Sequence, residues 1–320
     1  MQKAIGVLTS GGDAPGMNAA VRAVTRAAIR KGYKVYGIQR GYNGLINGEI
    51  VELGVRDVSD IIQRGGTILY TARCLEFKEE SGLQKATQKC RELNVEGIVV
   101  IGGDGSFRGA GDLSARGVPC IGLPGTIDND IACTDYTIGY DTAMNTAIEM
   151  VDKLRDTSQS HDRCSVVEVM GRNAGWIALN VAAATGAIAC LVPEKPVDLT
   201  AVAEKIKKAH ETQKEHFIVI VAEGCGDSKK IADDIAALSG IDTRLTVLGH
   251  VQRGGMPTLR DRVVASQMGY HAVELLSRGA SNRVVGMKDN KIVDFDIQEA
   301  LAMSKPFDDE LYRVCNEITF

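Results

Sequence analysis

Short apolar runs alternate with amphipathic stretches along almost all of this 320-residue chain. The strand-like runs occupy residues 5–9, 35–38, 97–101, 119–123, 166–170, 188–192, 217–222, 245–248 and 284–287. Stretches with the 3.6-residue period of a helix lie between most of them, among them residues 18–30, 143–155, 201–210 and 262–276. Repetition of strand, loop and helix predicts parallel sheets that are covered by helices on both faces. We therefore expect an α/β fold.

One long apolar stretch, residues 176–192, needs a separate interpretation. It contains Asn180, Thr185 and Gly186 and ends just before Pro193. These residues favour a buried helix followed by a strand over a helix that spans a membrane.

Charge and cysteine content exclude several classes of protein. The formal net charge is −4, whereas proteins that bind nucleic acids or membrane surfaces in general carry a basic excess. Eight cysteines are present without a C-x-x-C pair, which favours buried thiols in a reducing compartment over a zinc site or a disulfide framework. Residues 1–4 lead directly into the first strand-like run, so we expect no signal peptide and a cytoplasmic protein.

The loops that directly follow strands are rich in Gly, Asp and Arg. Parallel sheets bind ligands at the carboxyl ends of their strands, where helix N-termini point their amides. Two such loops, residues 11–16 and 101–106, carry paired glycines, which allow backbone amides to approach an anion but also suit a tight strand-to-helix turn. Neither loop completes a Walker A or a G-x-G-x-x-G motif, so a dinucleotide dehydrogenase loses support.

Residues 124–130, with the sequence Pro-Gly-Thr-Ile-Asp-Asn-Asp, form the most informative segment. Its carboxylates, Asp128 and Asp130, can divide two tasks that phosphoryl transfer needs, which are to orient a metal ion and to accept a proton. Asx-turns that close a polar loop are the structural alternative.

Basic residues complete the pattern. Six of them lie in or beside the strand-end loops, namely Arg73, Arg163, Arg172, Arg244, His250 and Arg253. Arginine offers paired donors that match phosphate oxygens, although a single such arginine is usually part of a surface ion pair. Four arginines on different strand-end loops, together with two glycine loops and an Asp pair, indicate a site for more than one phosphate.

Taken together, these loops closely resemble those of the bacterial ATP-dependent 6-phosphofructokinases. Eight segments match in order and span essentially the whole chain, at residues 8–20, 64–67, 99–106, 122–130, 155–161, 167–172, 221–224 and 246–255. The resemblance implies two Rossmann-like parallel-sheet domains with helices on both faces. Residues 1–138 with 251–305 would bind ATP, and residues 139–250 with 306–320 would bind fructose 6-phosphate. It also implies a homotetramer in which Arg163 and Arg244 reach into a neighbouring subunit.

The resemblance further implies a glycolytic kinase that transfers the γ-phosphoryl group of MgATP to the 1-hydroxyl of fructose 6-phosphate, with Asp128 as the general base. The transferring group would be surrounded by Gly12, Arg73, Thr126 and Arg172. The ATP site would be lined by Cys74, Lys78, Gly103, Gly105, Ser106 and Gly109. Mg²⁺ would be positioned by Asp104 and Asp130. The sugar 6-phosphate would be bound by Arg163, Arg244, His250 and Arg253, and the sugar by Met170, Gly171 and Glu223.

Two other functions stay open at this point. Pyrophosphate-dependent phosphofructokinases typically carry Asp and Lys where this chain has Gly105 and Gly125, so the lack of both side chains favours ATP. A non-catalytic sensor of sugar phosphate or nucleotide would be expected to lose its base, yet Asp128 is present.

The chain departs from the family's pattern in the effector site, where ADP activates and phosphoenolpyruvate inhibits. The residues that match this site are Arg22, Arg26, Arg155 and Lys214. Val55 and Thr212 replace arginines and Ile188 replaces a glutamate, so we expect effector control to be weak or altered. Trp176 replaces an Asp that is common just after residues 170–172.

Overall fold

The computed structural model of the chain describes residues 2–319. Residues 1 and 320, which the predicted domain ranges include, lie outside the described residues. The chain forms two compact units. Unit 1 comprises Met1–Ile127, Ile131–Thr142 and Arg253–Lys305, and unit 2 comprises Asp128–Asp130, Ala143–Gln252 and Pro306–Phe320. Within residues 2–319, no helix is both long and apolar enough to cross a membrane.

A seven-stranded sheet in the order β11-β10-β5-β4-β1-β2-β3 forms the centre of unit 1. Its strands are β1 (Ala4–Thr9), β2 (Lys34–Ile38), β3 (Ile50–Glu52), β4 (Val95–Gly102), β5 (Cys120–Pro124), β10 (Arg283–Lys288) and β11 (Lys291–Asp296). The inner strands run parallel, and β4 is buried over its last six residues, as the sequence predicted for a strand covered on both faces. The chain moves from β1 to β2 on one side and to β4 on the other, so the strand order reverses between β1 and β4.

The two edge strands of this sheet, β3 and β11, are antiparallel to their neighbours, and the sequence did not predict them. The turn between β10 and β11 is made by Asp289 and Asn290, both with positive φ, which matches the twist of a two-residue hairpin. The predicted α/β fold with parallel sheets is therefore confirmed for the inner strands, and the two edges of unit 1 add antiparallel pairs.

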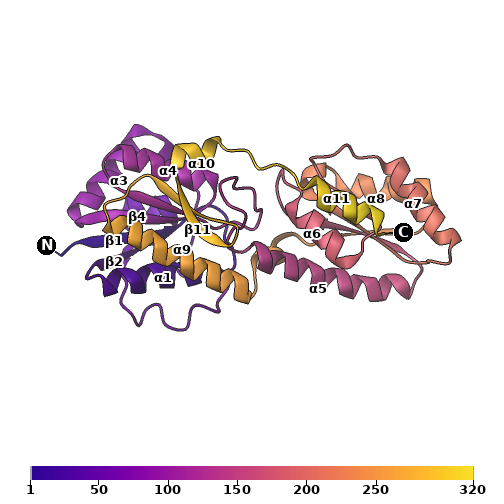
Figure 1. Cartoon of the computed structure of the whole chain (residues 1–320), viewed down its shortest axis with the longest axis horizontal. Coiled ribbons are helices and arrows are strands. Elements are labelled where there is room, and N and C mark those ends of the chain that lie inside the picture. The colour runs from indigo at the N-terminus through magenta and orange to yellow at the C-terminus, as the bar shows by residue number, and fades with distance from the viewer. Residues whose placement is uncertain (1, 320) are drawn as a thin grey trace. The chain divides into compact units, whose positions relative to one another are not determined.

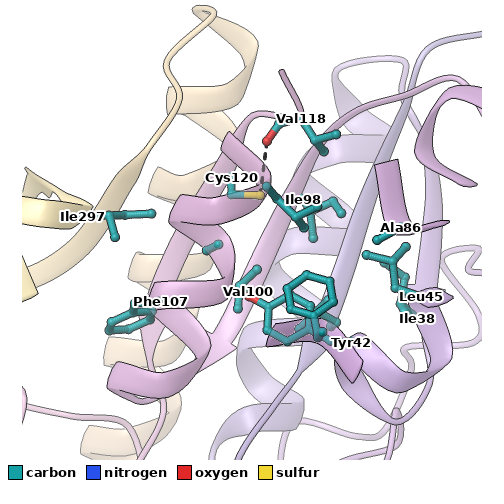
Figure 2. Close-up of a cluster of buried hydrophobic side chains, with 14 of the residues drawn as sticks. Ile38, Tyr42, Leu45, Ala86, Ile98, Val100, Phe107, Val118, Cys120 and Ile297 are labelled. Atoms are coloured by element: carbon teal, nitrogen blue, oxygen red, sulfur yellow. Dashed lines mark hydrogen bonds between the residues drawn. The ribbon is translucent and has the colours of Figure 1, made fainter. Parts of the chain in front are cut away.

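Helices cover both faces of the unit 1 sheet (Figure 1). They are α1 (Met17–Arg30), α2 (Gly41–Asn47), α3 (Glu80–Glu92), α4 (Asp104–Ala115), α9 (Leu259–Ser277) and α10 (Ile297–Ala302). On the face that Figure 2 shows, Leu45, Phe107 and Ile297 come from three different helices and join one apolar cluster with Ile98 and Val100 of β4. Burial of these side chains provides most of the force that holds the helices on the sheet.

Unit 2 contains a four-stranded parallel sheet in the order β7-β8-β6-β9. Its elements are α5 (Tyr140–Gln159), which begins in unit 1, β6 (Cys164–Val169), α6 (Trp176–Thr185), β7 (Ala189–Leu191), α7 (Leu199–Glu211), β8 (Phe217–Ala222), α8 (Ser228–Ser239), β9 (Thr243–Val247) and α11 (Asp309–Glu317). Asp198 and Asp227 begin α7 and α8 by accepting backbone N–H groups of the first turn. The helix and strand predicted within residues 176–192 are α6 and β7, which confirms that interpretation.

Candidate active site

The two glycine loops of unit 1 lie side by side at the carboxyl ends of β1 and β4. The N–H of Ser10 donates to the carbonyl oxygen of Ile101 at 2.9 Å. A Cβ at Gly102 would lie 2.5 Å from the carbonyl oxygen of Ser10, so only glycine fits between the loops. Because the strand order reverses between these strands, the structure brings both loops to the usual ligand position of a doubly wound sheet.

The second glycine loop opens α4. Gly103 is its extended N-cap residue, and Asp104 is exposed in the first turn. Apart from its chain neighbours and the backbone of α4 itself, a Cβ built on Gly103 or Gly105 would have no heavy atom of the described residues within 4 Å, so the space beside this helix N-terminus is open. Open space at a helix N-terminus suits a phosphate group.

Gly109 is explained by packing rather than by open space. Its Cβ would lie 2.8 Å from the ring of Tyr42 and 3.0 Å from that of Phe77. These rings stack with centroids 4.0 Å apart, and the hydroxyl of Tyr42 donates to the carbonyl oxygen of Ser106 at 2.5 Å. Tyr42 and Phe77 thus support the predicted nucleotide loop, and no motif in the sequence marked them for this role.

The structure brings Arg253 directly to the first glycine loop of unit 1. Its Nη1 donates to the carbonyl oxygen of Asp13 at 3.1 Å and would lie 2.6 Å from a Cβ at Gly12. Arg73 is exposed in the segment that precedes the short 3₁₀ helix Glu76–Lys78. Burial raises the pKa of the neighbouring Cys74 thiol, so this cysteine stays protonated.

Asp128 and Arg172 are brought together within unit 2. The carboxylate of Asp128 has no exposed surface, and its Oδ2 lies 3.1 Å from Nε of Arg172, whose side chain is 62% exposed. Asn129 and Arg172 both have left-handed backbone conformations, with φ of 51° and 55°. Strained backbone of this kind is typical of functional sites. Asp130 is half-buried, and Thr126, which belongs to unit 1, is buried.

Glu223 fixes the loop that carries Arg172. Its Oε1 accepts the backbone N–H groups of Gly171 at 3.1 Å and of Arg172 at 2.6 Å. The neighbouring loops that follow β6 and β8 are so close that a Cβ at Gly224 would collide with the carbonyl oxygen of Arg172. Met170, the residue before this pair, donates its N–H to Oε1 of Gln252 at 3.3 Å.

Arg163 and Arg244 lie at the opposite end of the unit 2 sheet, so their predicted place in or beside strand-end loops was wrong. Arg163 directly precedes β6, and Arg244 is the second residue of β9, where it pairs with Ser165. Arg172 and His250 follow the carboxyl ends of the same two strands. A six-residue strand separates the two sets by roughly 20 Å, which exceeds the length of one sugar phosphate.

The residues predicted to position Mg²⁺ are Asp104 in unit 1 and Asp130 in unit 2. Within residues 2–319, no group of three or more His, Cys, Asp or Glu side chains could hold a metal by itself. Mg²⁺ is usually bound by one or two carboxylates together with waters and substrate phosphates, and Asp104 and Asp130 each offer a carboxylate of this kind.

The predicted effector residues lie in both units. Burial, and next to it the charge of Arg26, lowers the pKa of Arg22 on α1. In unit 2, burial and the charge of Arg155 lower the pKa of Lys214 and of the neighbouring His216. Ile188, which the resemblance aligned with a glutamate of the effector site, is buried in the apolar core of unit 2.

Trp176 has a structural explanation. It is the first residue of α6, and its ring lies 6.2 Å from that of Phe307, which lies 5.7 Å from that of Tyr312 on α11. The three rings therefore connect α6 to the C-terminal helix.

The sequence and the fold of the chain are similar to those of known proteins. The family described as Phosphofructokinase matches residues 4–276. An ATP-dependent 6-phosphofructokinase of Clostridium botulinum is 57% identical over 312 residues, which are 98% of each chain. The solved structure of phosphofructokinase from Saccharomyces cerevisiae superposes with a TM-score of 0.93 at 33% identity over 99% of this chain, which spans 50% of the yeast chain. A pyrophosphate-dependent phosphofructokinase from Marinobacter aquaeolei has a TM-score of 0.84 at 20% identity, covering 100% of this chain and 91% of its own, and shares the fold.

Proposed function

The chain belongs to the phosphofructokinase family and phosphorylates fructose 6-phosphate with ATP to give fructose 1,6-bisphosphate, and we propose how its residues divide this work. The observation that carries the activity is the 57% identity to an ATP-dependent 6-phosphofructokinase over 98% of both chains. In this proposal unit 1 binds ATP and unit 2 binds fructose 6-phosphate. The enzyme would work in the cytoplasm.

Asp128 is the general base in this proposal. It accepts the proton of the sugar 1-hydroxyl while Arg172, 3.1 Å from it, neutralises charge on the transferring phosphoryl group. Gly12, Arg73 and Thr126 stabilise the same group from unit 1. Asp104 and Asp130 would hold Mg²⁺, which would neutralise phosphate charge when bound.

The sugar site is shared between two copies of the chain. His250, Arg253 and the loop of Glu223 would bind the sugar phosphate of their own chain. Arg163 and Arg244, roughly 20 Å away along β6 and β9, would bind the 6-phosphate of a neighbouring copy. Support comes from the unit 2 sheet, where His250 and the loop of Glu223 follow the carboxyl ends of strands and Arg163 and Arg244 lie at the amino ends. Sharing of the site requires at least two copies, and we propose the homotetramer that the family resemblance implies; its mass in solution is measurable by light scattering.

A coupled assay for fructose 1,6-bisphosphate tests the activity. We expect rapid product formation with ATP and Mg²⁺, and none without a phosphate donor. Product formation from pyrophosphate at a comparable rate would favour the pyrophosphate-dependent alternative. Binding of fructose 6-phosphate without turnover would favour a sensor.

A further inference from the structure

Asp242 contacts both arginines that lie at the amino end of the unit 2 sheet. Its Oδ2 accepts a hydrogen bond from Nε of Arg163 at 2.7 Å and lies 3.3 Å from Nη2 of Arg244. Asp242 directly precedes β9, and its carbonyl oxygen accepts the N–H of Cys164 at 2.9 Å. One carboxylate thus joins two guanidinium groups across neighbouring strands.

The backbone that carries these side chains is fixed. Arg163 donates its N–H to the carbonyl oxygen of Ser158 at 3.1 Å and accepts the N–H of Phe217 at 3.0 Å. Arg244 is held in the β6–β9 pairing. Only the directions of the two side chains can vary, and they are 33% exposed in Arg163 and 64% exposed in Arg244. Without a partner, each long side chain would sample many rotamers.

The geometry of the contact leaves phosphate-binding atoms available. The carboxylate takes Nε of Arg163, so Nη1 and Nη2 of that guanidinium keep their hydrogens for another acceptor. The negative charge between the two cations also reduces their mutual repulsion, which allows them to stay close before any anion arrives.

We propose that Asp242 is a positioning residue that orients Arg163 and Arg244 for the 6-phosphate of the sugar. This inference rests on the proposed function of these two arginines. Orientation before binding lowers the entropy that ordering them costs when the ligand arrives. Asp242 itself does not touch the reacting atoms, so its effect falls on sugar binding and not on the chemical step.

Kinetics of variants test the proposal in the intact enzyme. Asp242→Ala is expected to raise KM for fructose 6-phosphate about tenfold, the loss of one charge-assisted hydrogen bond, with kcat and KM for ATP unchanged. Asp242→Asn, which keeps an oxygen acceptor, is expected to have a smaller effect of the same sign. Asp233→Ala, which removes an exposed carboxylate paired with Lys229 on α8, is the matched control.

A double-mutant cycle separates positioning from general structure. In an Arg163→Ala background, Asp242→Ala is expected to raise KM by less than it does in the otherwise unchanged enzyme, because only Arg244 remains to be oriented. The denaturation midpoint is expected to stay nearly constant, because exposed ion pairs add little stability.

The two ways of failing are distinguishable. If Arg163→Ala and Arg244→Ala leave KM for fructose 6-phosphate unchanged, the proposed function of the arginines is wrong. If both raise KM while Asp242→Ala and Asp242→Asn leave it unchanged or lower it, the arginines bind the sugar and the positioning role of Asp242 is wrong.

Discussion

The anion sites that we propose for unit 1 and unit 2 are of two different kinds. In unit 1, the glycines that follow β4 leave open space at the N-terminus of α4. In unit 2, carboxylates hold arginine side chains or the loops that carry them. Asp128 pairs with the side chain of Arg172, and Asp242 pairs with that of Arg163. Glu223 accepts the backbone N–H of Arg172. We therefore expect anion binding to weaken in unit 1 when side chains are added at the glycines, and in unit 2 when charged side chains are removed.

The largest expected effect tests the charge-based site of unit 2. Asp128→Asn removes the proton acceptor and leaves Arg172 without its anionic partner. We expect kcat to fall by about 10²–10⁴-fold, with the fold and both KM values largely kept. Asp233→Asn on α8 serves as the control. Near-normal turnover by purified Asp128→Asn enzyme would remove Asp128 from the role of base.

The second prediction tests the open space of unit 1. Gly105→Asp adds a carboxylate where, apart from the chain neighbours and the backbone of α4 itself, no heavy atom of the described residues lies within 4 Å of the new Cβ, so the protein is expected to fold. Repulsion of the nucleotide phosphates is expected to raise KM for ATP by roughly ten- to a hundredfold, with KM for fructose 6-phosphate unchanged.

Ala115→Asp at the opposite end of α4 is the matched control for Gly105→Asp. Gly125→Lys is less informative, because its Cβ would lie 2.9 Å from the side chain of Ile101 and would disturb packing. Unchanged ATP kinetics in Gly105→Asp would mean that the nucleotide phosphates do not approach the start of α4.

A third prediction concerns Gly12, which lies beside the charged side chain of Arg253 in unit 1. Gly12→Ala puts a methyl group 2.6 Å from Nη1 of Arg253, which must leave its position. Displacing a side chain from its rotamer costs about 0.5–1.5 kcal/mol, so KM for fructose 6-phosphate is expected to rise by roughly two- to tenfold. In an Arg253→Ala background, Gly12→Ala is expected to leave that KM unchanged. A further rise there would show that Gly12 acts independently of Arg253.

The smallest expected effect concerns the effector residues. Val55 and Thr212 lack the charges that would bind an anion, at about 1.5–3 kcal/mol per lost charge-assisted hydrogen bond. Phosphoenolpyruvate at millimolar concentration is therefore expected to shift the fructose 6-phosphate saturation curve by less than about fivefold, the lower end of typical allosteric coupling. A large shift that MgADP reverses would contradict this expectation.

NMR titration of His216 provides an independent measurement of anion binding to Arg155 and Lys214, two of the effector residues. Burial and the charges of Arg155 and Lys214 lower the pKa of His216. An anion bound to these two groups would offset their charge and raise that pKa. We expect little change in the pKa of His216 when phosphoenolpyruvate is added.

Local patterns in the sequence predicted most of the fold. The apolar runs became strands, because each is short and lies between turn residues and helical stretches, and residues 176–192 formed α6 and β7. The edge strands β3 and β11 were missed, because short, partly exposed strands carry little hydrophobic signal. The roles assigned to the site residues came from motifs shared with a family, and their catalytic functions stay predictions.

The sequence by itself determined which residues can carry the chemistry, namely Asp128, its loop and the surrounding arginines, because residue type fixes charge and hydrogen-bonding capacity. Only the tertiary structure decided which of them meet. Arg163 and Arg172 are nine residues apart in sequence but lie at opposite ends of β6, whereas Arg163 and Asp242, 79 residues apart, share a hydrogen bond. Strand direction and strand order set these distances, and both depend on how the whole sheet packs.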